Sequence, residues 1–215
     1  MRREGRALVR SLRHALSGRL KRVRRKIDIQ SVKKVNMCCG DRNIPGYVGI
    51  DMATSADICL DLSKKDLPFR DGSLEAVVCM SAINYFSRPR AQQLIREVHR
   101  VLAKQGVARF GVQDMQSLAK RYIDNDVEFF FQKLPNGTER FEGPTLGDKF
   151  AAWFYGYMID GFPCRYFYDY KALEYLFREA GFSVVERMPF QESRLLDIVL
   201  IDNRPEQMFF LEAVK

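Results

Sequence analysis

The chain has 215 residues, of which 47% are apolar, so it can bury one sizeable core and is not a disordered composition. Residues 1–34 hold 13 Lys/Arg and two acids, whereas residues 35–215 hold 22 Lys/Arg and 25 acids. The net charge of +8 therefore belongs to an N-terminal arm, and the mildly acidic body is a poor candidate for a nucleic-acid-binding surface.

Several functional classes are disfavoured at once. No run approaches the roughly 18 apolar residues that span a bilayer, and the Arg-rich start lacks the apolar core of a secretory signal. We therefore expect a soluble, cytoplasmic protein. Five cysteines without a CxxC pair indicate reduced, mostly buried thiols. The two histidines, His14 and His99, lack neighbours for a zinc site or a Ser-His-Asp hydrolase, so no metal is expected.

Residues 1–31 form a basic, amphipathic arm. Apolar residues recur every three or four positions, which lines one face of a helix and leaves arginines around the rest. Three interpretations stay open: docking on the chain's own body, binding to an anionic membrane surface, or service as a nucleic-acid arm or transit peptide. The apolar positions are Leu8, Leu12, Leu16, Leu20, Val23 and Ile27.

From residue 32 onward, short apolar runs alternate with longer connections. A helix is expected over "SRPRAQQLIREVHRVLAKQG", with Pro89 near its start and Gly106 just past its end. Strands that alternate with long connections predict a parallel sheet with right-handed crossovers. The expected strands cover 32–38, 47–50, 57–60, 74–80 and 107–112.

The C-terminal part predicts one helix and two strands. Asp169 can cap a helix over "DYKALEYLFREAGF", and Gly181 can end it. "SVVERM" and "QMFFLEAV" are expected to pair antiparallel at the sheet edge. "LLDIVLID", between them, is either an added strand or a short buried helix.

Residues 127–168 are an aromatic-rich flap. Fourteen of the chain's 26 aromatic residues fall in 129–170, including the only tryptophan, Trp153. The flap either packs its own aromatic side chains on the core or forms a lid over a pocket near the strand carboxyl ends, and both can hold.

The expected strand ends carry the candidate ligand-binding residues. Ligands of open parallel sheets bind outside the carboxyl ends of the strands. Residues 38–40 follow the first strand, Asp51 ends the second, 61–62 follow the third and 81–86 follow the fourth. A carboxylate such as Asp51 can accept hydrogen bonds from both ribose hydroxyls. GxGxxG and GxxxxGK[ST] are absent, so a nucleoside without phosphates fits better than a dinucleotide or a nucleoside triphosphate.

Four blocks together resemble a known family. "KVNMCCGDRNIPGYVGID", "ADICLDLSKKDLPFRDGSLEAVVCMSAINYFSR", "REVHRVLAKQGVARFGVQD" and "DYKALEYLFREAGF" are similar to the successive motifs of class I S-adenosylmethionine-dependent methyltransferases. The similarity covers roughly residues 32–215 and is closest to a small bacterial branch associated with polysaccharide or secondary-metabolite pathways. It implies a single domain over 32–215 with a Rossmann-like, doubly wound α/β sheet of seven strands, mostly parallel with an antiparallel C-terminal strand.

The resemblance also implies a cofactor and roles for individual residues. The cofactor is S-adenosylmethionine, and the acceptor is a small molecule or saccharide, methylated on oxygen or nitrogen. By this resemblance, the loop around Gly40 runs past the methionine end of the cofactor, and Asp51 holds the ribose. The other positions flank the adenine or line the inner side of the cofactor. The implied cofactor contacts are Cys38, Cys39, Gly40, Asp51, Met52, Asp61, Leu62, Ser81 and Ala82.

Three positions depart from the family pattern. Cys38 takes the place of the first glycine in Gly-x-Gly, and we expect it to keep a negative φ with its Cβ turned away from the cofactor. Residues 83–85 replace a common histidine, and 104–106 replace Pro-Gly-Gly. A catalytically eroded scaffold protein and an RNA methyltransferase that uses the arm therefore stay open as alternatives.

The candidates for positioning or deprotonating the acceptor are Tyr85 and Asp114, which follow the fourth and fifth strands. For Asp114, a role as a helix cap before "MQSLAKRYI" is an equal alternative. His99 lies within the helical block "REVHRVL" and is assigned a structural or surface role.

Overall fold

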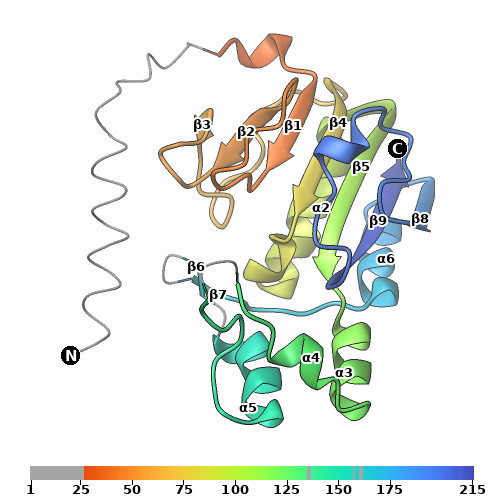
Figure 1. Ribbon diagram of the computed structural model, residues 1–215. Helices are drawn as coiled ribbons and strands as arrows, with labels where there is room; N and C mark the ends of the chain where they lie inside the picture. Colours follow the sequence, from red (N-terminus) through yellow and green to blue (C-terminus); the bar gives the residue numbers. More distant parts are fainter. Residues whose placement is uncertain (1–26, 135–136, 157, 160–161) are drawn as a thin grey trace.

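A mixed β-sheet runs through the computed structural model, with helices α2 and α6 behind it and a group of short helices below the ends of the central strands (Figure 1). The structure describes residues 27–134, 137–156, 158–159 and 162–215. The arm predicted over 1–31 lies outside the described residues up to position 26. Its last residues form a 3-10 turn, Ile29–Ser31, capped by the Asp28 side chain.

The sheet has seven strands in the order β3-β2-β1-β4-β5-β9-β8. β1 lies between β2 and β4 and is parallel to both, whereas β9 is antiparallel to both of its neighbours. The predicted fold class is thereby confirmed, including the antiparallel C-terminal pair. The strands are β1 (Lys34–Met37), β2 (Val48–Asp51), β3 (Ile58–Cys59), β4 (Leu74–Met80), β5 (Leu102–Gln113), β8 (Val184–Met188) and β9 (Met208–Val214).

The two long helices form where the sequence predicts them. Helix α6 (Tyr170–Glu179) begins at Asp169, whose side chain accepts the N–H of Ala172 at 2.7 Å. Helix α2 (Arg88–Val101) ends well before Gly106, so the predicted C-terminal boundary was wrong. Leu102 has already left the helical conformation and pairs with β4, since β5 starts earlier than the apolar pattern indicated.

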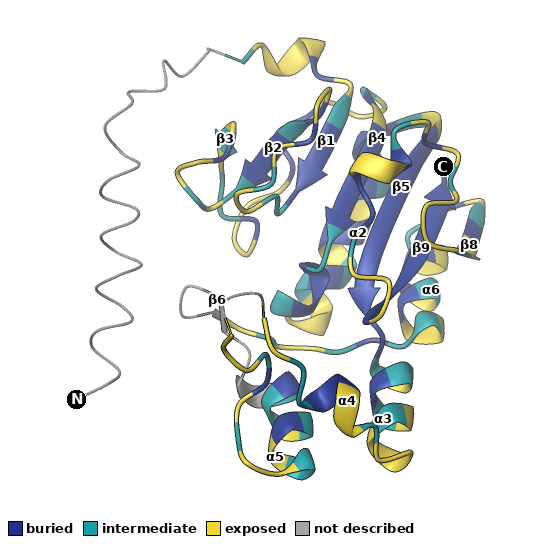
Figure 2. Ribbon diagram, in the orientation of Figure 1, coloured by how far each residue is buried: buried dark blue, intermediate teal, exposed yellow. Residues whose placement is uncertain are grey.

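The two faces of the sheet are covered differently. Alternate residues of β4 and β5 pack against α2 and α6 in the main core. The opposite face packs against Ile44, Tyr47 and the segment 189–207, which contains a single 3-10 turn, Ile198–Leu200. The ambiguous stretch "LLDIVLID" is therefore a turn that covers the sheet and not an added strand. Figure 2 shows the central strands β1, β4, β5 and β9 mostly in the colour of buried residues, whereas the edge strands β3 and β8 are partly exposed.

A buried arginine fixes this covering segment. Arg109 of β5 is fully buried, and its Nε and Nη2 donate to the two oxygens of Asp202 at 3.1 and 2.5 Å. Its remaining N–H groups donate to the carbonyls of Pro189 and Glu192, both at 3.1 Å. Glu212 of β9 lies directly opposite in the sheet, 3.7 Å from Nη1. A charge at the centre of the sheet is satisfied only because the segment wraps around it.

The same segment also holds the amino-terminal strands. Asp197 accepts from Lys34 Nζ and from the Tyr47 hydroxyl, each at 3.0 Å. Arg42, on the loop after β1, donates to the carbonyls of Leu200 and Ile201 at 2.6 and 2.5 Å. Residues near both ends of the chain are thus tied together over one face of the sheet.

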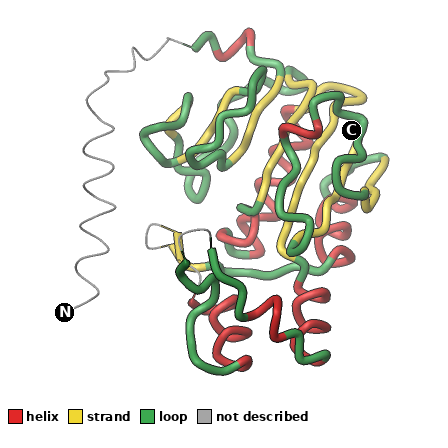
Figure 3. Tube along the Cα trace, in the orientation of Figure 1, coloured by secondary structure: helices red, strands yellow, loops and turns green. Residues whose placement is uncertain are grey.

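The aromatic flap forms a separate hydrophobic cluster. The core of this cluster consists of Phe129, Phe130, Phe141 and Trp153 of the flap together with Leu118, which precedes the flap, and it is distinct from the main core. Figure 3 shows these short helices grouped beyond the carboxyl end of β5. The helical elements are α3 (Met115–Ile123), α4 (Val127–Phe130), α5 (Leu146–Ala151) and a π-helical turn (Ala152–Gly156), with a small hairpin of β6 (Met158–Ile159) and β7 (Phe162–Pro163).

Two sequence predictions concern the described residues as a whole. Across these residues, no helix is long and apolar enough to cross a membrane. All five cysteines are free thiols, but only Cys79 is buried and Cys38, Cys39 and Cys164 are partly exposed, so the prediction of mostly buried thiols was wrong. Cys59, in contrast, is exposed, because it ends the short edge strand β3.

Replacing Arg109 with leucine should be strongly destabilising. The change leaves Asp202 buried without its cation, whereas Glu212 keeps its ion pair with Arg194. Removing one partner of a buried ion pair costs about 3–5 kcal/mol in comparable cases. Urea unfolding followed by circular dichroism measures the loss. Arg96→Leu, on the exposed face of α2, is the matched control and should stay within about 0.5 kcal/mol of the parent. Equal stability of the two variants would refute the anchoring role of Arg109.

Candidate functional site

Asp51, at the end of β2, holds the loop that follows β1. Its Oδ2 accepts the N–H of Gly40 at 2.9 Å, and its Oδ1 accepts the N–H of Ala53 at 2.9 Å. The N–H of Cys39 donates to the carbonyl of Ile50 at 3.1 Å. The half-buried carboxylate thus lies beside the glycine loop at the switch point of the sheet, and each of its oxygens keeps further acceptor capacity.

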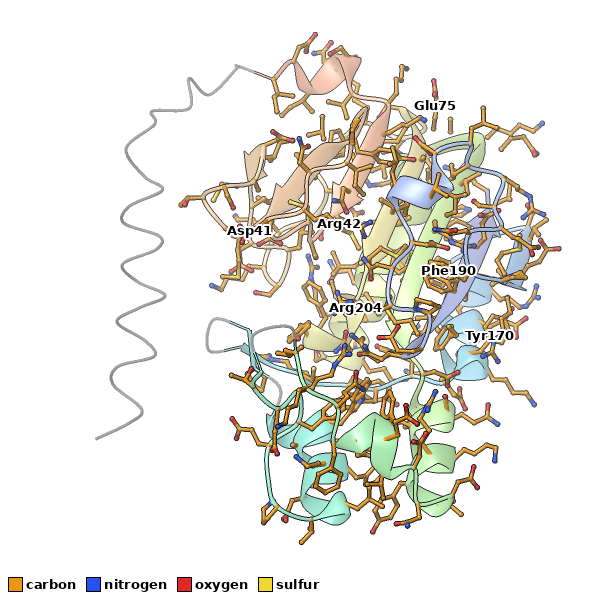
Figure 4. The ribbon with its side chains drawn as sticks, in the orientation of Figure 1. Asp41, Arg42, Glu75, Tyr170, Phe190 and Arg204 are labelled. Atoms are coloured by element: carbon orange, nitrogen blue, oxygen red, sulfur yellow. The ribbon has the colours of Figure 1, made fainter. Side chains whose placement is uncertain are left out.

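Space for a ligand lies next to this carboxylate. A Cβ built on Gly40 would meet no atom within 4 Å, and the residue has a φ of +53°. Met52, directly after Asp51, is 47% exposed. The backbone at Gly40 is therefore accessible beside Asp51, and the contact of both residues with a cofactor stays a prediction. Figure 4 marks Asp41 and Arg42 on this same loop.

The prediction for the backbone of Cys38 was wrong. Cys38 has a φ of +56°, in the left-handed region that non-glycine residues rarely occupy. The chain turns sharply out of β1 there, and the side chain packs against the main core beside the Cys79 thiol. A hydrogen bond with Cys79, together with burial, raises the pKa of Cys38. The cysteine thus keeps the backbone conformation that glycine would supply, at a cost of about 1–2 kcal/mol.

A second strained residue lies at the end of the neighbouring strand. Ser81 follows β4 with a φ of +60°, and its N–H donates to the carbonyl of Gly111 at 2.8 Å. Its hydroxyl accepts a hydrogen bond from Gln113 Nε2. Ala82 is buried in the core behind it. Because β1 and β4 are adjacent, Cys38 and Ser81 place two left-handed residues at the switch point, where strain commonly marks a functional site.

Cys39 packs on the backbone of β2. A Cβ at Gly49 would lie 2.8 Å from Cys39 Sγ, so a larger residue at this position would have to displace the Cys39 thiol. Asp57 accepts the N–H of Gly49 at 2.9 Å. Burial, with the charges of Asp51 and Asp57, raises the pKa of Cys39 to about 12, so its thiol stays protonated near neutral pH.

Met52, Asp61 and Leu62 are the residues predicted beside the adenine, and the last two lie in different environments. The hydroxyl and N–H of Ser63 and the ammonium of Lys64 surround Asp61, and they lower the pKa of its carboxyl group to about 2. Asp61 therefore remains an ionised acceptor. Leu62 has only 3% of its surface exposed, and its carbonyl accepts from Arg90 Nε at 2.8 Å. Its side chain belongs to the core, so any contact of Leu62 with a ligand is restricted to its backbone.

Asp114 caps helix α3. Its Oδ1 accepts the N–H groups of Gln116 and Ser117 at 3.0 and 3.2 Å, and its Oδ2 is paired with Arg187 at 3.0 Å. Both oxygens are thus engaged, which favours the capping interpretation over a role as a base. Tyr85 lies in the 3-10 turn Ile83–Tyr85 and hydrogen-bonds the Cys164 sulfur.

Sequence reasoning missed a second group of residues near these strand ends. A small hollow of about 10 Å³, with room for roughly one water molecule, lies between the ends of β4 and β5 and the aromatic flap. A signal was present: Asn84 and Gln113 are polar residues at the ends of apolar strand runs. The hollow is lined by Asn84, Gln113, Trp153, Cys164, Phe167 and Gln207.

Part of the chain matches a known family model. The family model described as "Methyltransferase domain" matches residues 30–110. This span runs from the strand before Gly40 into β5 and contains every predicted cofactor contact. A search of curated proteins found no match.

Solved structures with a similar fold include S-adenosylmethionine-dependent methyltransferases. One from Thermotoga maritima, described as a possible histamine N-methyltransferase, is 17% identical and has a TM-score of 0.47, with 85% of this chain and 82% of that chain covered. One from Methanosarcina mazei is 17% identical with a TM-score of 0.48, covering 86% and 93%. One from Archaeoglobus fulgidus is 13% identical with a TM-score of 0.49, covering 87% and 88%.

Two substitutions at Cys38 should separate its backbone strain from its side-chain packing. Glycine and alanine both remove the thiol, but only glycine adopts the left-handed conformation without a penalty. The glycine variant should therefore be about 1 kcal/mol more stable than the alanine variant in urea unfolding. An alanine variant as stable as the glycine variant would mean that φ at position 38 is not left-handed in solution.

Proposed function

We propose that the chain is a class I S-adenosylmethionine-dependent methyltransferase that transfers a methyl group from this cofactor to oxygen or nitrogen of a small-molecule acceptor, which the match of residues 30–110 to the methyltransferase-domain model supports. One observation carries the proposal: the Asp51 carboxylate lies beside open space at Gly40, where the order of parallel strands reverses. An adenosine without phosphates needs a hydroxyl acceptor and close backbone approach, and both are present.

The residues at the strand ends fit the cofactor. Asp51 would hold the ribose hydroxyls, and the backbone at Gly40 would pass the methionine end. Asp61, kept ionised by Ser63 and Lys64, would accept from the adenine amino group. The backbone of Leu62 and the half-exposed Ser81 would complete the wall.

The protein's own contribution to the chemistry is positioning. The cofactor supplies an activated methyl group when it is bound. The side chains must then align the acceptor, exclude water and accommodate the proton of the acceptor group. Asp114 is held by its helix and by Arg187, and Tyr85 is hydrogen-bonded to Cys164. Both therefore serve to orient the acceptor better than to remove its proton.

A scaffold protein without cofactor is the main competing function. That alternative requires the space beside Gly40 and Asp51 to be filled by Cys38 or by the flap. The Cys38 side chain instead packs toward Cys79, and the space at Gly40 is open. These contacts support a binding-competent site, with an acidic body that favours a small-molecule or saccharide acceptor over RNA.

Calorimetric titration with S-adenosylhomocysteine tests the proposal. The parent protein should bind, and Asp51→Asn should weaken binding by about 1–3 kcal/mol, or roughly 5- to 150-fold, because an amide accepts fewer hydrogen bonds than a carboxylate. Glu75→Gln removes the same charge at the opposite, amino-terminal end of β4 and should leave the affinity unchanged (Figure 4). An absence of heat and of any thermal shift in the parent protein would overturn the proposal.

Residues 1–30 lead to a second proposal, a peripheral site at an anionic membrane surface inside the cell. Their charge and leucine spacing support it. Sedimentation with phosphatidylserine vesicles should pull down the full chain at low salt, and a chain lacking residues 1–26 should stay in solution. Equal sedimentation of both, or binding to RNA in place of vesicles, would reject the membrane assignment.

A further inference from the structure

The connection between β3 and β4 has no secondary structure of its own. Residues 60–73 are all described, and they contain neither a helix nor a strand. A crossover between parallel strands usually contains a helix, which satisfies its own backbone groups. The backbone groups of this connection therefore need partners from another part of the molecule.

Helix α2 supplies these partners from one side. The four residues that do so are three or four positions apart, which places them along one face of a helix. Glu97 accepts the N–H of Leu67 at 3.2 Å, and Gln93 donates to Asp66 at 3.2 Å. The two arginines of this set each bond two backbone carbonyls and one aspartate of the connection. The four residues are Arg90, Gln93, Glu97 and Arg100.

Arg90 binds the first part of the connection. Its Nε donates to the carbonyl of Leu62 at 2.8 Å, and its Nη2 donates to the carbonyl of Lys65. Its Nη1 is paired with Asp66 at 3.0 Å. The Arg90 side chain is only 13% exposed, so water competes little for these contacts. Three nitrogens of one planar guanidinium thus fix three neighbouring points of the chain.

The segment that Arg90 binds also contains the carboxylate expected beside the adenine. The carbonyl of Asp61 accepts the N–H groups of Lys64 and Lys65 at 3.1 and 3.0 Å, so residues 61–65 form one compact turn. Arg90 bonds this turn at Leu62 and at Lys65, and the Leu62 side chain is buried in the main core. The position of Asp61 is therefore set from the side of α2.

The place of Arg90 in its helix also requires an explanation. Helix α2 begins at Arg88, so Arg90 lies in its first turn, which contains no acid. The amino-terminal end of a helix has a partial positive charge, which favours acids and disfavours cations. An arginine in this turn opposes the helix dipole. Its bonds to the carbonyls of the neighbouring turn give it a role that an acid could not fill.

We propose that Arg90 is a positioning residue that makes the site selective for adenine, an inference that rests on the proposed function. Arg90 does not contact the cofactor. It fixes the turn from which the ionised Asp61 accepts the adenine amino group. A base with an oxygen in place of that amino group offers no donor to the carboxylate, so its rejection depends on Asp61 being held in place.

Arg100 is the matched control, because its contacts have the same chemistry at the other end of the connection. Its Nη2 donates to the carbonyl of Leu67 at 3.0 Å, and its Nη1 donates to the carbonyl of Phe69 at 2.9 Å. It is also paired with Asp71 at 2.6 Å. If Arg90 only stabilised the connection, the loss of either arginine would have the same effect on ligand binding.

Calorimetric titration of the full-length protein with two ligands separates positioning from stability. The parent should prefer S-adenosylhomocysteine over S-inosylhomocysteine, in which an oxygen replaces the amino group, by about tenfold or more. Arg90→Leu should reduce this preference to about threefold or less, through weaker binding of the adenosyl compound. Arg100→Leu should keep the parent's preference to within about twofold, although both variants should lower the Tm.

Three results would overturn the assignment. The first is a parent protein that binds the two ligands equally. The second is an unchanged preference in Arg90→Leu, and the third is an equal loss of preference in Arg100→Leu.

Arg90→Lys provides the test if the leucine variant does not fold. Lysine keeps a positive charge near Asp66 but lacks the planar fork that reaches Leu62 and Lys65 from two nitrogens. The lysine variant should therefore also lose about threefold or more of the preference for the adenosyl compound. A lysine variant with the parent's full preference would contradict the proposal.

The parent's affinity for S-adenosylhomocysteine separates this inference from the proposed function. If the parent binds this compound and Arg90→Leu keeps the preference, the positioning role fails and the proposed function stands. If the parent binds neither compound, the proposed function fails and the role of Arg90 fails with it.

Discussion

The ion pair between Arg109 and Asp202 is the constraint on which the rest of the structure depends. A central sheet must be covered on both faces, and its two long helices, α2 and α6, cover the same one. The segment 189–207 covers the other face because the buried arginine binds its carbonyls and its aspartate. Arginine suits this task, since its planar guanidinium can satisfy several acceptors at once.

Segment 189–207 also reaches the carboxyl ends of the parallel strands. Its carbonyls at Leu200 and Ile201 hold Arg42, two residues beyond Gly40. The glycine loop is therefore restrained from one side by the cover and from the other by Asp51. The packing of segment 189–207 on the sheet and the shape of the proposed cofactor site are thereby coupled, although Arg109 itself does not line the site.

Strain and unpaired polar groups gather at the same strand ends. Cys38 and Ser81 adopt left-handed conformations on adjacent strands, and Gln113 links Ser81 to the hollow beneath the flap. Strained dihedrals and unpaired buried polar groups lower the free energy of unfolding. They commonly persist where a function requires them. The aromatic flap packs its rings in a cluster of its own, separate from the main core, and its role as a lid stays a prediction.

The sequence by itself determined the strands, the two long helices, the cap at Asp169 and the acidic residues at the strand ends. These follow from apolar periodicity and from local backbone preferences, which act between near neighbours in the chain. Only the tertiary structure decided the left-handed φ of Cys38, the early end of α2 and the covering role of 189–207. It also brought Asn84, Gln113 and Trp153 around one hollow. The reason is physical: a strained dihedral is retained by packing around it, and polar partners far apart in sequence leave no periodic pattern, so their pairing exists only once the sheet has placed them side by side.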